Sequence, residues 1–192
     1  MLHYIKGFLV EVNPTTAIVE CSGIGYEVSI SLNTYSAISG LKELQLFLHP
    51  IYKEDSQTLY GFHSKKECSI FQQLISVSGV GGNTARTILS SLDPAEVIAG
   101  VSREDVAMLQ GVKGIGVKTA QRIIIDLKDK LIKLHDDDLS FPQSPGVRSE
   151  ATAALEVLGY NSRQSERVLN TILKQSPDLS VEELIKAALK KL

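Results

Sequence analysis

Cysteine is scarce in this chain of 192 residues, which has only Cys21 and Cys68 and no C-x-x-C pair. This excludes a disulfide framework and a cysteine-based zinc site, and both thiols are expected to be reduced and buried in a cytoplasmic protein. No apolar run reaches the roughly 18 residues that a membrane helix needs, so no membrane association is expected. The first twelve residues lack the cleavage site and the apolar segment of a secretory signal, so we expect no signal peptide.

Motifs of several common enzyme classes are also absent from the sequence. There is no Walker A pattern, G-x-x-x-x-G-K-[ST], so the chain is not expected to hydrolyse ATP. There is no G-x-S-x-G nucleophile motif, and the four histidines do not have the spacing of metal ligands. We therefore expect no catalytic residue, no metal and no cofactor.

The net charge of −2 argues at first against a nucleic-acid partner, but the charge is unevenly distributed. Residues 1–62 carry −3, residues 63–135 carry +3, residues 136–147 carry −3 and residues 148–192 carry +1. A local basic surface matters more for DNA binding than the total charge. The central segment is therefore the candidate DNA-binding part.

The first 62 residues have the pattern of short β-strands. Apolar and polar residues alternate over residues 26–32, and Leu44, Leu46 and Leu48 recur at the same spacing of two. Turn-forming pairs divide this stretch into about five strands; they are Asn13-Pro14, Ser22-Gly23 and Ser39-Gly40. Five short strands in so few residues predict a small β-barrel of the OB kind, although an SH3-like barrel would give a similar pattern.

The pattern becomes helical from residue 64. Ser64 and Glu67 predict a capping box, and Asp93 followed by Pro94 predicts a second helix start. The expected helices span residues 64–79, 93–100, 102–111 and about 119–133, with Gly79, Gly100 and Gly111 ending the first three.

The end of the chain is expected to be a separate helical domain. Residues 136–147 combine three aspartates with two prolines and two serines, which predicts a flexible acidic linker. Residues 148–192 predict three short helices, with a capping box formed by Ser180 and Glu183 at the start of the last. The expected fold class is α+β, divided into residues 1–62, 63–135, 136–147 and 148–192.

The central segment contains an internal repeat at an offset of 35 residues. Residues 78–92 align without gaps with residues 113–127, and both glycines, a Thr-Ala pair, an Ile and the final Leu coincide. Such self-similarity indicates one supersecondary unit used twice. Each copy is predicted to be a helix, a Gly-x-Gly turn and a second helix.

The glycines suit this turn to the binding of an anion. Without a Cβ, glycine adopts backbone angles closed to other residues and leaves its N–H group open to an anion. The helix that follows presents its unpaired first N–H groups and the positive end of its dipole to the same anion. Because backbone amides contact phosphates and not base edges, we expect DNA binding that is largely independent of sequence.

The expected DNA-backbone contacts come from both copies. They are Gly79, Val80, Gly81, Asn83, Thr84 and Arg86 in the first copy, and Gly114, Ile115, Gly116, Lys118, Thr119 and Arg122 in the second. The first copy has Asn83 where the second has Lys118, so the first is expected to bind phosphate more weakly. A single Gly-x-Gly is often only a tight turn, but its duplication with the same neighbours favours a binding motif.

An acidic segment, residues 53–57, is expected to join the last two strands of the barrel. The plainest interpretation is a solvated turn. Glu54 and Asp55 could instead bind Mg²⁺ at a DNA nick, but nothing nearby in the sequence supplies the third acid or the base that such a site usually needs. A third interpretation is that the two carboxylates repel phosphates and help to separate DNA strands.

Two other classes of protein are compatible with parts of the sequence. A glycosylase or structure-specific nuclease could hold DNA with the same turns and use Asp93 or Asp126 as its acid. Asp93 is better explained as a helix cap, and Asp126 as an ion-pair partner of cations one helical turn away. A pure protein-interaction scaffold would leave the duplicated turns and the basic segment unexplained.

Together these features resemble the RuvA family, the Holliday-junction-binding subunits of the bacterial branch-migration complex. The resemblance covers the whole chain, the repeat corresponds to two helix-hairpin-helix motifs, and IYKEDSQTLYGF at residues 51–62 is the most specific match. It implies a cytoplasmic homotetramer, with an octamer as the alternative, that holds four-way junction DNA open without catalysis. It also implies a role in DNA recombination and repair, within the SOS response to DNA damage.

The resemblance assigns roles to two further groups of residues. Glu54 and Asp55 become an acidic pin at the crossover, which replaces the interpretation as a solvated turn. The last three helices become a docking domain for RuvB, a hexameric ATPase motor, and the RuvC resolvase is a further implied partner. The expected motor contacts are Leu158, Tyr160, Leu169 and Ile172, whereas Leu155 and Val168 are expected in the core.

Overall fold

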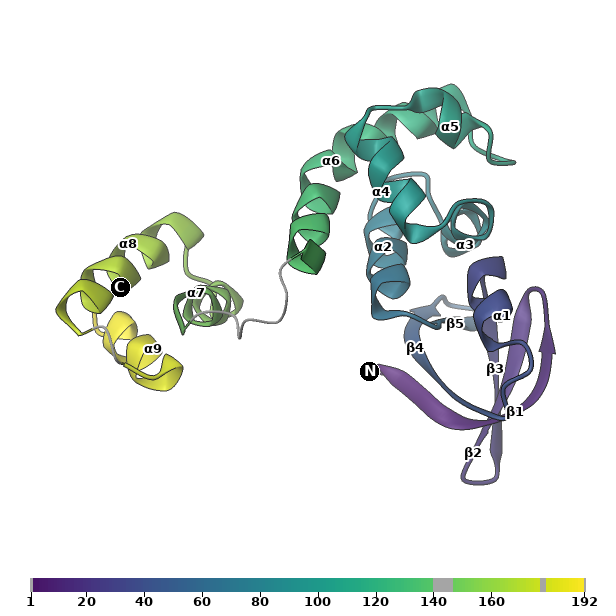
Figure 1. The fold of residues 1–192 in the computed structure, drawn as a ribbon, viewed down its shortest axis with the longest axis horizontal. Coiled ribbons are helices and arrows are strands. Elements are labelled where there is room, and N and C mark those ends of the chain that lie inside the picture. The colour runs from purple at the N-terminus through teal and green to yellow at the C-terminus, as the bar shows by residue number, and fades with distance from the viewer. Residues whose placement is uncertain (1, 140–146, 177–178, 192) are drawn as a thin grey trace. The chain divides into compact units, whose positions relative to one another are not determined.

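The computed structural model describes residues 2–139, 147–176 and 179–191. The chain forms two compact units, Met1–Asp137 and Asp138–Leu192, and has an α+β fold (Figure 1). The first unit contains a β-barrel and a helical domain, and the second contains three helices. In the part of the chain that the structure describes, no helix is both long and apolar enough to cross a membrane.

Five strands form a closed barrel in the order β1-β2-β3-β5-β4, which confirms the expected OB-like barrel. They are β1 (Tyr4–Asn13), β2 (Thr16–Cys21), β3 (Ile24–Ile30), β4 (Glu43–Tyr52) and β5 (Gln57–Phe62). Neighbouring strands pair antiparallel except β3 and β5, whose parallel pairing closes the barrel. The alternating Leu44, Leu46 and Leu48 of β4 are buried inside, as their period of two predicts.

A short helix, α1 (Leu32–Ile38), connects β3 to β4 and is not predicted by the strand pattern. Ser31 caps it by accepting a hydrogen bond from the Thr34 N–H at 3.0 Å. Leu32 therefore lies on the helix, with 44% of its surface exposed, and does not extend β3. The pattern misleads here because the capping serine occupies the place of a polar strand residue.

Five helices form the rest of the first unit: α2 (Lys65–Ile75), α3 (Gly82–Ser91), α4 (Pro94–Ser102), α5 (Val106–Gln110) and α6 (Val117–Leu139). Gly100 lies inside α4 and does not end it, and the Met108 side chain occupies the space where a Cβ on Gly100 would stand. Ser102 is the last residue of α4, and Asp105 caps α5 by accepting from the Met108 N–H at 2.9 Å.

The long helix α6 extends further than its sequence pattern predicts. It includes residues 136–139, which were expected to belong to the linker. The predicted linker residues 140–146 lie outside the described residues.

The second unit is the expected bundle of three helices, α7 (Val147–Val157), α8 (Ser162–Gln175) and α9 (Val181–Leu189). The predicted capping box of Ser180 and Glu183 at the start of α9 is present. Six residues form the buried core; they are Ala151, Leu155, Leu169, Ile172, Leu184 and Ala188.

The barrel and the helical domain of the first unit share an apolar core. The Phe71 ring on α2 packs against the rings of Tyr60 and Phe62 on β5, with centroids 4.9 and 4.8 Å apart. These aromatic residues belong to the same cluster as the apolar residues of α3 and α6. The last strand of the barrel is therefore packed directly onto the helices that follow it.

A buried carboxyl group, Glu67 of α2, adds hydrogen bonds to this joint. Glu67 is 3% exposed and accepts hydrogen bonds from the hydroxyls of Ser31 and, at 2.7 Å, Thr34. The capping serine, Ser64, accepts from the Glu67 N–H at 3.1 Å, so the predicted cap forms, but the carboxylate turns to α1. Burial raises the pKa of Glu67, and hydrogen bonds from both hydroxyls and the nearby charge of His63 oppose that rise.

The substitution Glu67→Gln tests this pKa shift. A carboxyl whose pKa is higher in the folded than in the unfolded protein binds its proton more tightly when folded. Its contribution to stability is therefore full below about pH 4.5 and is lost as the pH rises through the raised pKa. Glutamine does not titrate, so over this interval the free energy of unfolding of the wild type should fall relative to that of Glu67→Gln. Urea unfolding at a series of pH values measures this difference, and parallel pH profiles would contradict the assignment.

Candidate nucleic-acid interface

The two Gly-x-Gly turns have the same backbone geometry. Gly79 and Gly114 have φ angles of +91° and +90°, in the left-handed region that favours glycine. In each copy the N–H of the next residue donates to the carbonyl three residues earlier, at 3.0 Å in the first copy and 3.1 Å in the second. The sequence repeat is therefore a structural repeat.

The second glycine of each turn stands at the start of a helix. The carbonyls of Gly81 and Gly116 each accept from an alanine N–H four residues later, at 2.9 Å in both copies. A Cβ built on either glycine would have no atom within 4 Å, so packing does not require glycine here. The first N–H groups of α3 and α6 have no partner within their own helix. The absence of a side chain at Gly81 and Gly116 leaves the approach to these N–H groups open.

The residues between the glycines anchor the turns. Val80 and Ile115 are only 5% and 6% exposed, so their side chains belong to the core and only their backbone can face a ligand. Thr84 and Thr119, at equivalent positions on the following helices, are half-buried. Val80 and Ile115 therefore lie in the turns and the two threonines on the helices that follow, and any phosphate contact by Val80 and Ile115 is limited to main-chain atoms.

The expected cations of the second copy lie on the exposed side of α6. Lys118 and Arg122 line a depression of about 340 Å³ together with Gln121, Ile125 and Asp126. The Arg122 guanidinium also donates to the Ser78 carbonyl at 3.2 Å, directly before the first turn. Arg122 therefore connects the second copy to the first, and its positive charge lies beside both turns.

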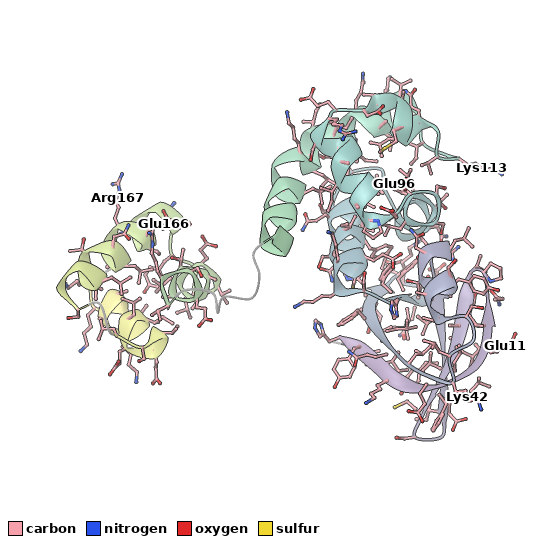
Figure 2. The ribbon with its side chains drawn as sticks, viewed as in Figure 1. Glu11, Lys42, Glu96, Lys113, Glu166 and Arg167 are labelled. Carbon is pink, nitrogen blue, oxygen red and sulfur yellow. The ribbon has the colours of Figure 1, made fainter. Side chains whose placement is uncertain are left out.

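A further cation, Lys113, lies directly before Gly114 and is absent from the contacts expected from the sequence. Figure 2 shows Lys113 at the protruding tip of the second turn, where it is exposed. The first copy has Ser78 at the equivalent position. The position of Lys113 next to an expected phosphate-binding glycine is the signal in the sequence that could have identified it.

Two of the residues expected to contact DNA in the first copy are hydrogen-bonded to the barrel. Asn83 Oδ1 accepts a hydrogen bond from the Tyr60 hydroxyl at 3.1 Å. Arg86 Nη1 donates to the carbonyl of Thr15, in the turn between β1 and β2, at 3.1 Å. These two side chains have a structural role that the repeat alone does not indicate.

The acidic segment forms the turn between β4 and β5. Lys53 donates its N–H to the Ser56 carbonyl at 2.8 Å, and Glu54 and Asp55 are exposed between them. Among the described residues, no group of three His, Cys, Asp or Glu side chains could hold a metal ion. The interpretation as a Mg²⁺ site therefore gains no support.

The C-terminal candidates divide into exposed and buried residues. Leu158 and Tyr160 are 58% and 37% exposed. Leu169 and Ile172 are 0% and 5% exposed, so the expectation of a surface role is wrong for both, because α8 packs them against α7 and α9. Leu155 is buried as expected, and Val168 is partly buried.

An apolar residue that sequence reasoning missed, Val157, is 88% exposed beside Leu158. Helix α7 ends there because Gly159, with a φ of +92°, turns the chain. The signal in the sequence was an apolar pair directly before a helix-ending glycine.

The fold and the site define a class of protein, an OB-like barrel joined to tandem helix-hairpin-helix motifs. Residues 1–61 match the RuvA N terminal domain, residues 71–129 the SAM-like helix-hairpin-helix tandem and residues 146–192 the RuvA C-terminal domain. The chain belongs to the RuvA family. Three relatives are called Holliday junction branch migration complex subunit RuvA: those of Christiangramia forsetii (54% identical over 193 residues), Flavobacterium psychrophilum (50% over 193) and Porphyromonas gingivalis (43% over 202). All three alignments cover 100% of both chains.

The substitution Gly116→Ala separates a binding role of the glycine from a packing role. A Cβ at Gly116 meets no protein atom, so the free energy of unfolding should change by less than about 1 kcal/mol. The same Cβ would stand in front of the open N–H groups, so DNA affinity should fall at least several-fold. Urea unfolding and fluorescence anisotropy with labelled DNA measure the two effects.

Gly114→Ala is the matched control for this prediction. It places a side chain at a φ of +90° and should destabilise the fold by about 1–2 kcal/mol. If Gly116→Ala keeps full DNA affinity, the open approach to the N–H groups is not what binds phosphate.

Proposed function

We propose that this chain binds Holliday junctions through the DNA backbone and serves as the non-catalytic DNA-binding subunit of a branch-migration complex. The observation that carries the proposal is the repeated turn, with the same glycine φ and the same open helix start in both copies. Membership of the RuvA family and the names of the relatives agree with it.

Each helix-hairpin-helix copy supplies one site for a phosphate. The phosphate accepts hydrogen bonds from the N–H groups at the start of α3 or α6, where the helix dipole also favours negative charge. Arg122 bonds the second copy to the carbonyl of Ser78 at the first turn, so the two sites are kept at a fixed spacing. This arrangement suits two contacts along one duplex arm.

The acidic turn repels DNA phosphates, whereas the hairpins attract them. Glu54 and Asp55 are exposed on a four-residue turn at one end of the barrel. In a homotetramer, or in an octamer made of two, these turns gather at the crossover and repel the phosphates of the exchanging strands. An open junction leaves space for this acidic pin, whereas a continuous duplex does not.

The second unit is the part of the chain that binds a partner protein in this proposal. The exposed apolar residues Val157, Leu158 and Tyr160 form a small surface suited to a hexameric ATPase motor of the RuvB kind. The motor supplies ATP hydrolysis, and this chain loads it onto the junction. In this proposal residues 1–62 and 63–135 hold DNA, residues 136–147 link the units, and residues 148–192 dock the motor. A resolvase of the RuvC kind would act on the same open junction.

Binding to a synthetic four-way junction and to a linear duplex of equal length, at several salt concentrations with Mg²⁺ present, tests the proposal. The expected result is tighter binding to the junction, affinity that falls steeply with salt, and uncut DNA. Equal affinity for both DNAs would contradict junction recognition, and cleavage would favour the nuclease class.

The double variant Glu54→Gln/Asp55→Asn belongs in the same experiment. It removes the repulsion that a continuous duplex meets at the acidic turn, so duplex affinity should rise more than junction affinity. An unchanged ratio of the two affinities would remove the acidic turn from the proposed function.

A further inference from the structure

The two hairpin copies differ at four positions that lie on one face of the helix after the turn. These positions are Gly82, Asn83, Arg86 and Ser90 on α3, and Val117, Lys118, Gln121 and Ile125 on α6. Their spacing places them within about one quarter of the helix circumference. Four of the differences between the copies therefore lie on one surface of each helix, whereas those at Thr87 and Ser91 of α3 lie elsewhere on its circumference.

On α3 this face packs against the barrel. A Cβ on Gly82 would lie 2.6 Å from the Tyr60 ring and 2.8 Å from Ile51 Cδ1, so a side chain does not fit between α3 and the barrel. The Tyr60 hydroxyl donates to Asn83 Oδ1 at 3.1 Å. Glycine and asparagine at the start of α3 are thus explained by the barrel strand beside them.

The remaining contacts continue along α3. Arg86 donates to the Thr15 carbonyl at 3.1 Å, and the Leu32 N–H donates to Ser90 Oγ at 3.1 Å. The side-chain amide of Asn33 donates to the carbonyls of two leucines at the end of α3, at 2.6 and 3.1 Å. The barrel and α1 therefore hold α3 from its first turn to its last.

On α6 the equivalent face is exposed. Val117 and Ile125 are 55% and 77% exposed, and Lys118 and Gln121 are also exposed. At the second position after each turn, α6 thus has an exposed lysine, whereas α3 has an exposed asparagine whose side-chain oxygen is hydrogen-bonded to Tyr60 of the barrel.

We infer that Asn83 is a positioning residue, which through Tyr60 keeps the first hairpin in register with the acidic turn and so contributes to junction preference. The inference rests on the proposed function. Tyr60 lies on β5, the strand that directly follows the turn bearing Glu54 and Asp55. Its hydroxyl therefore bonds the first hairpin to the strand that carries the pin.

This register matters only where DNA has a crossover. A junction must place its crossover at the acidic turn and its arm on the hairpin at the same time, so the spacing of the two affects its affinity. A linear duplex can bind the hairpins without that requirement. Burial raises the pKa of Tyr60, with the charge of Arg86 acting in the opposite direction, so the hydroxyl stays protonated and donates.

Tyr60→Phe tests the inference in the full chain, because it removes the hydroxyl and keeps the ring that packs on Phe71. The ratio of junction to duplex affinity should fall about threefold to tenfold, the equivalent of one hydrogen bond. Duplex affinity should stay within about twofold of the wild type. Asn83→Ala, which removes the acceptor instead, should reproduce the effect and serves as the second variant if Tyr60→Phe does not fold.

Lys118→Asn is the matched control, because it places asparagine at the equivalent position of the second copy. It should lower junction and duplex affinity by the same factor and leave their ratio unchanged, since Lys118 contributes charge and not register.

Asn83→Lys distinguishes the positioning role from that of a weak phosphate ligand. A weak ligand converted to lysine would raise both affinities and preserve their ratio, whereas loss of the bond to Tyr60 should lower the ratio. In a Tyr60→Phe background, Asn83→Lys should lower it no further, because the bond is already lost.

Two outcomes separate this inference from the proposed function. A wild type without junction preference overturns both. A wild type that prefers the junction, with Tyr60→Phe and Asn83→Ala that fold and keep the full ratio, overturns the positioning role alone.

Discussion

A phosphate oxygen can reach a backbone N–H group only where no Cβ stands between them, and the proposed DNA-binding site depends on this steric constraint. Gly79 and Gly114 take the positive φ that turns the chain, whereas Gly81 and Gly116 face open space at the start of a helix. Val80 and Ile115 are buried between them and hold each turn in place. Backbone groups positioned in this way bind phosphate without reading bases, which is what a protein that acts on exchanging DNA strands of any sequence requires.

The second constraint is the joint between the barrel and the first hairpin. Aromatic packing of Phe71 against β5, the buried Glu67 with its two hydroxyl donors, and the hydrogen bonds along α3 all cross the same boundary. A buried carboxyl is expensive unless its oxygens are hydrogen-bonded, so Glu67 also favours one arrangement of α1 against α2. The two glycine turns proposed to bind phosphate and the acidic turn proposed to repel it are thereby parts of one body (Figure 1).

The sequence predicted the barrel, the paired hairpins and the acidic turn, because each has a local signal: a period of two, a repeat, or a turn between strands. It did not predict which side chains of a helix would contact a distant segment. Asn83 and Arg86 are examples, since their barrel partners lie in other parts of the chain. Gly100 does not end its helix, and the Met108 side chain that fills the space beside it comes from another helix. Leu169 and Ile172 also have apolar patterns that do not reveal whether a neighbouring helix or a partner covers them.

In the proposed function, this chain holds DNA by its phosphates. The most direct measurement is the affinity for four-way junctions in which the arm phosphates are replaced, a few at a time, by neutral methylphosphonates, beside junctions whose arm sequences are scrambled. Affinity should fall at two separate groups of neutralised phosphates on each arm, one for each hairpin, and should be unchanged by scrambling. Binding that survives neutralisation but changes with the arm sequence would contradict the proposed function.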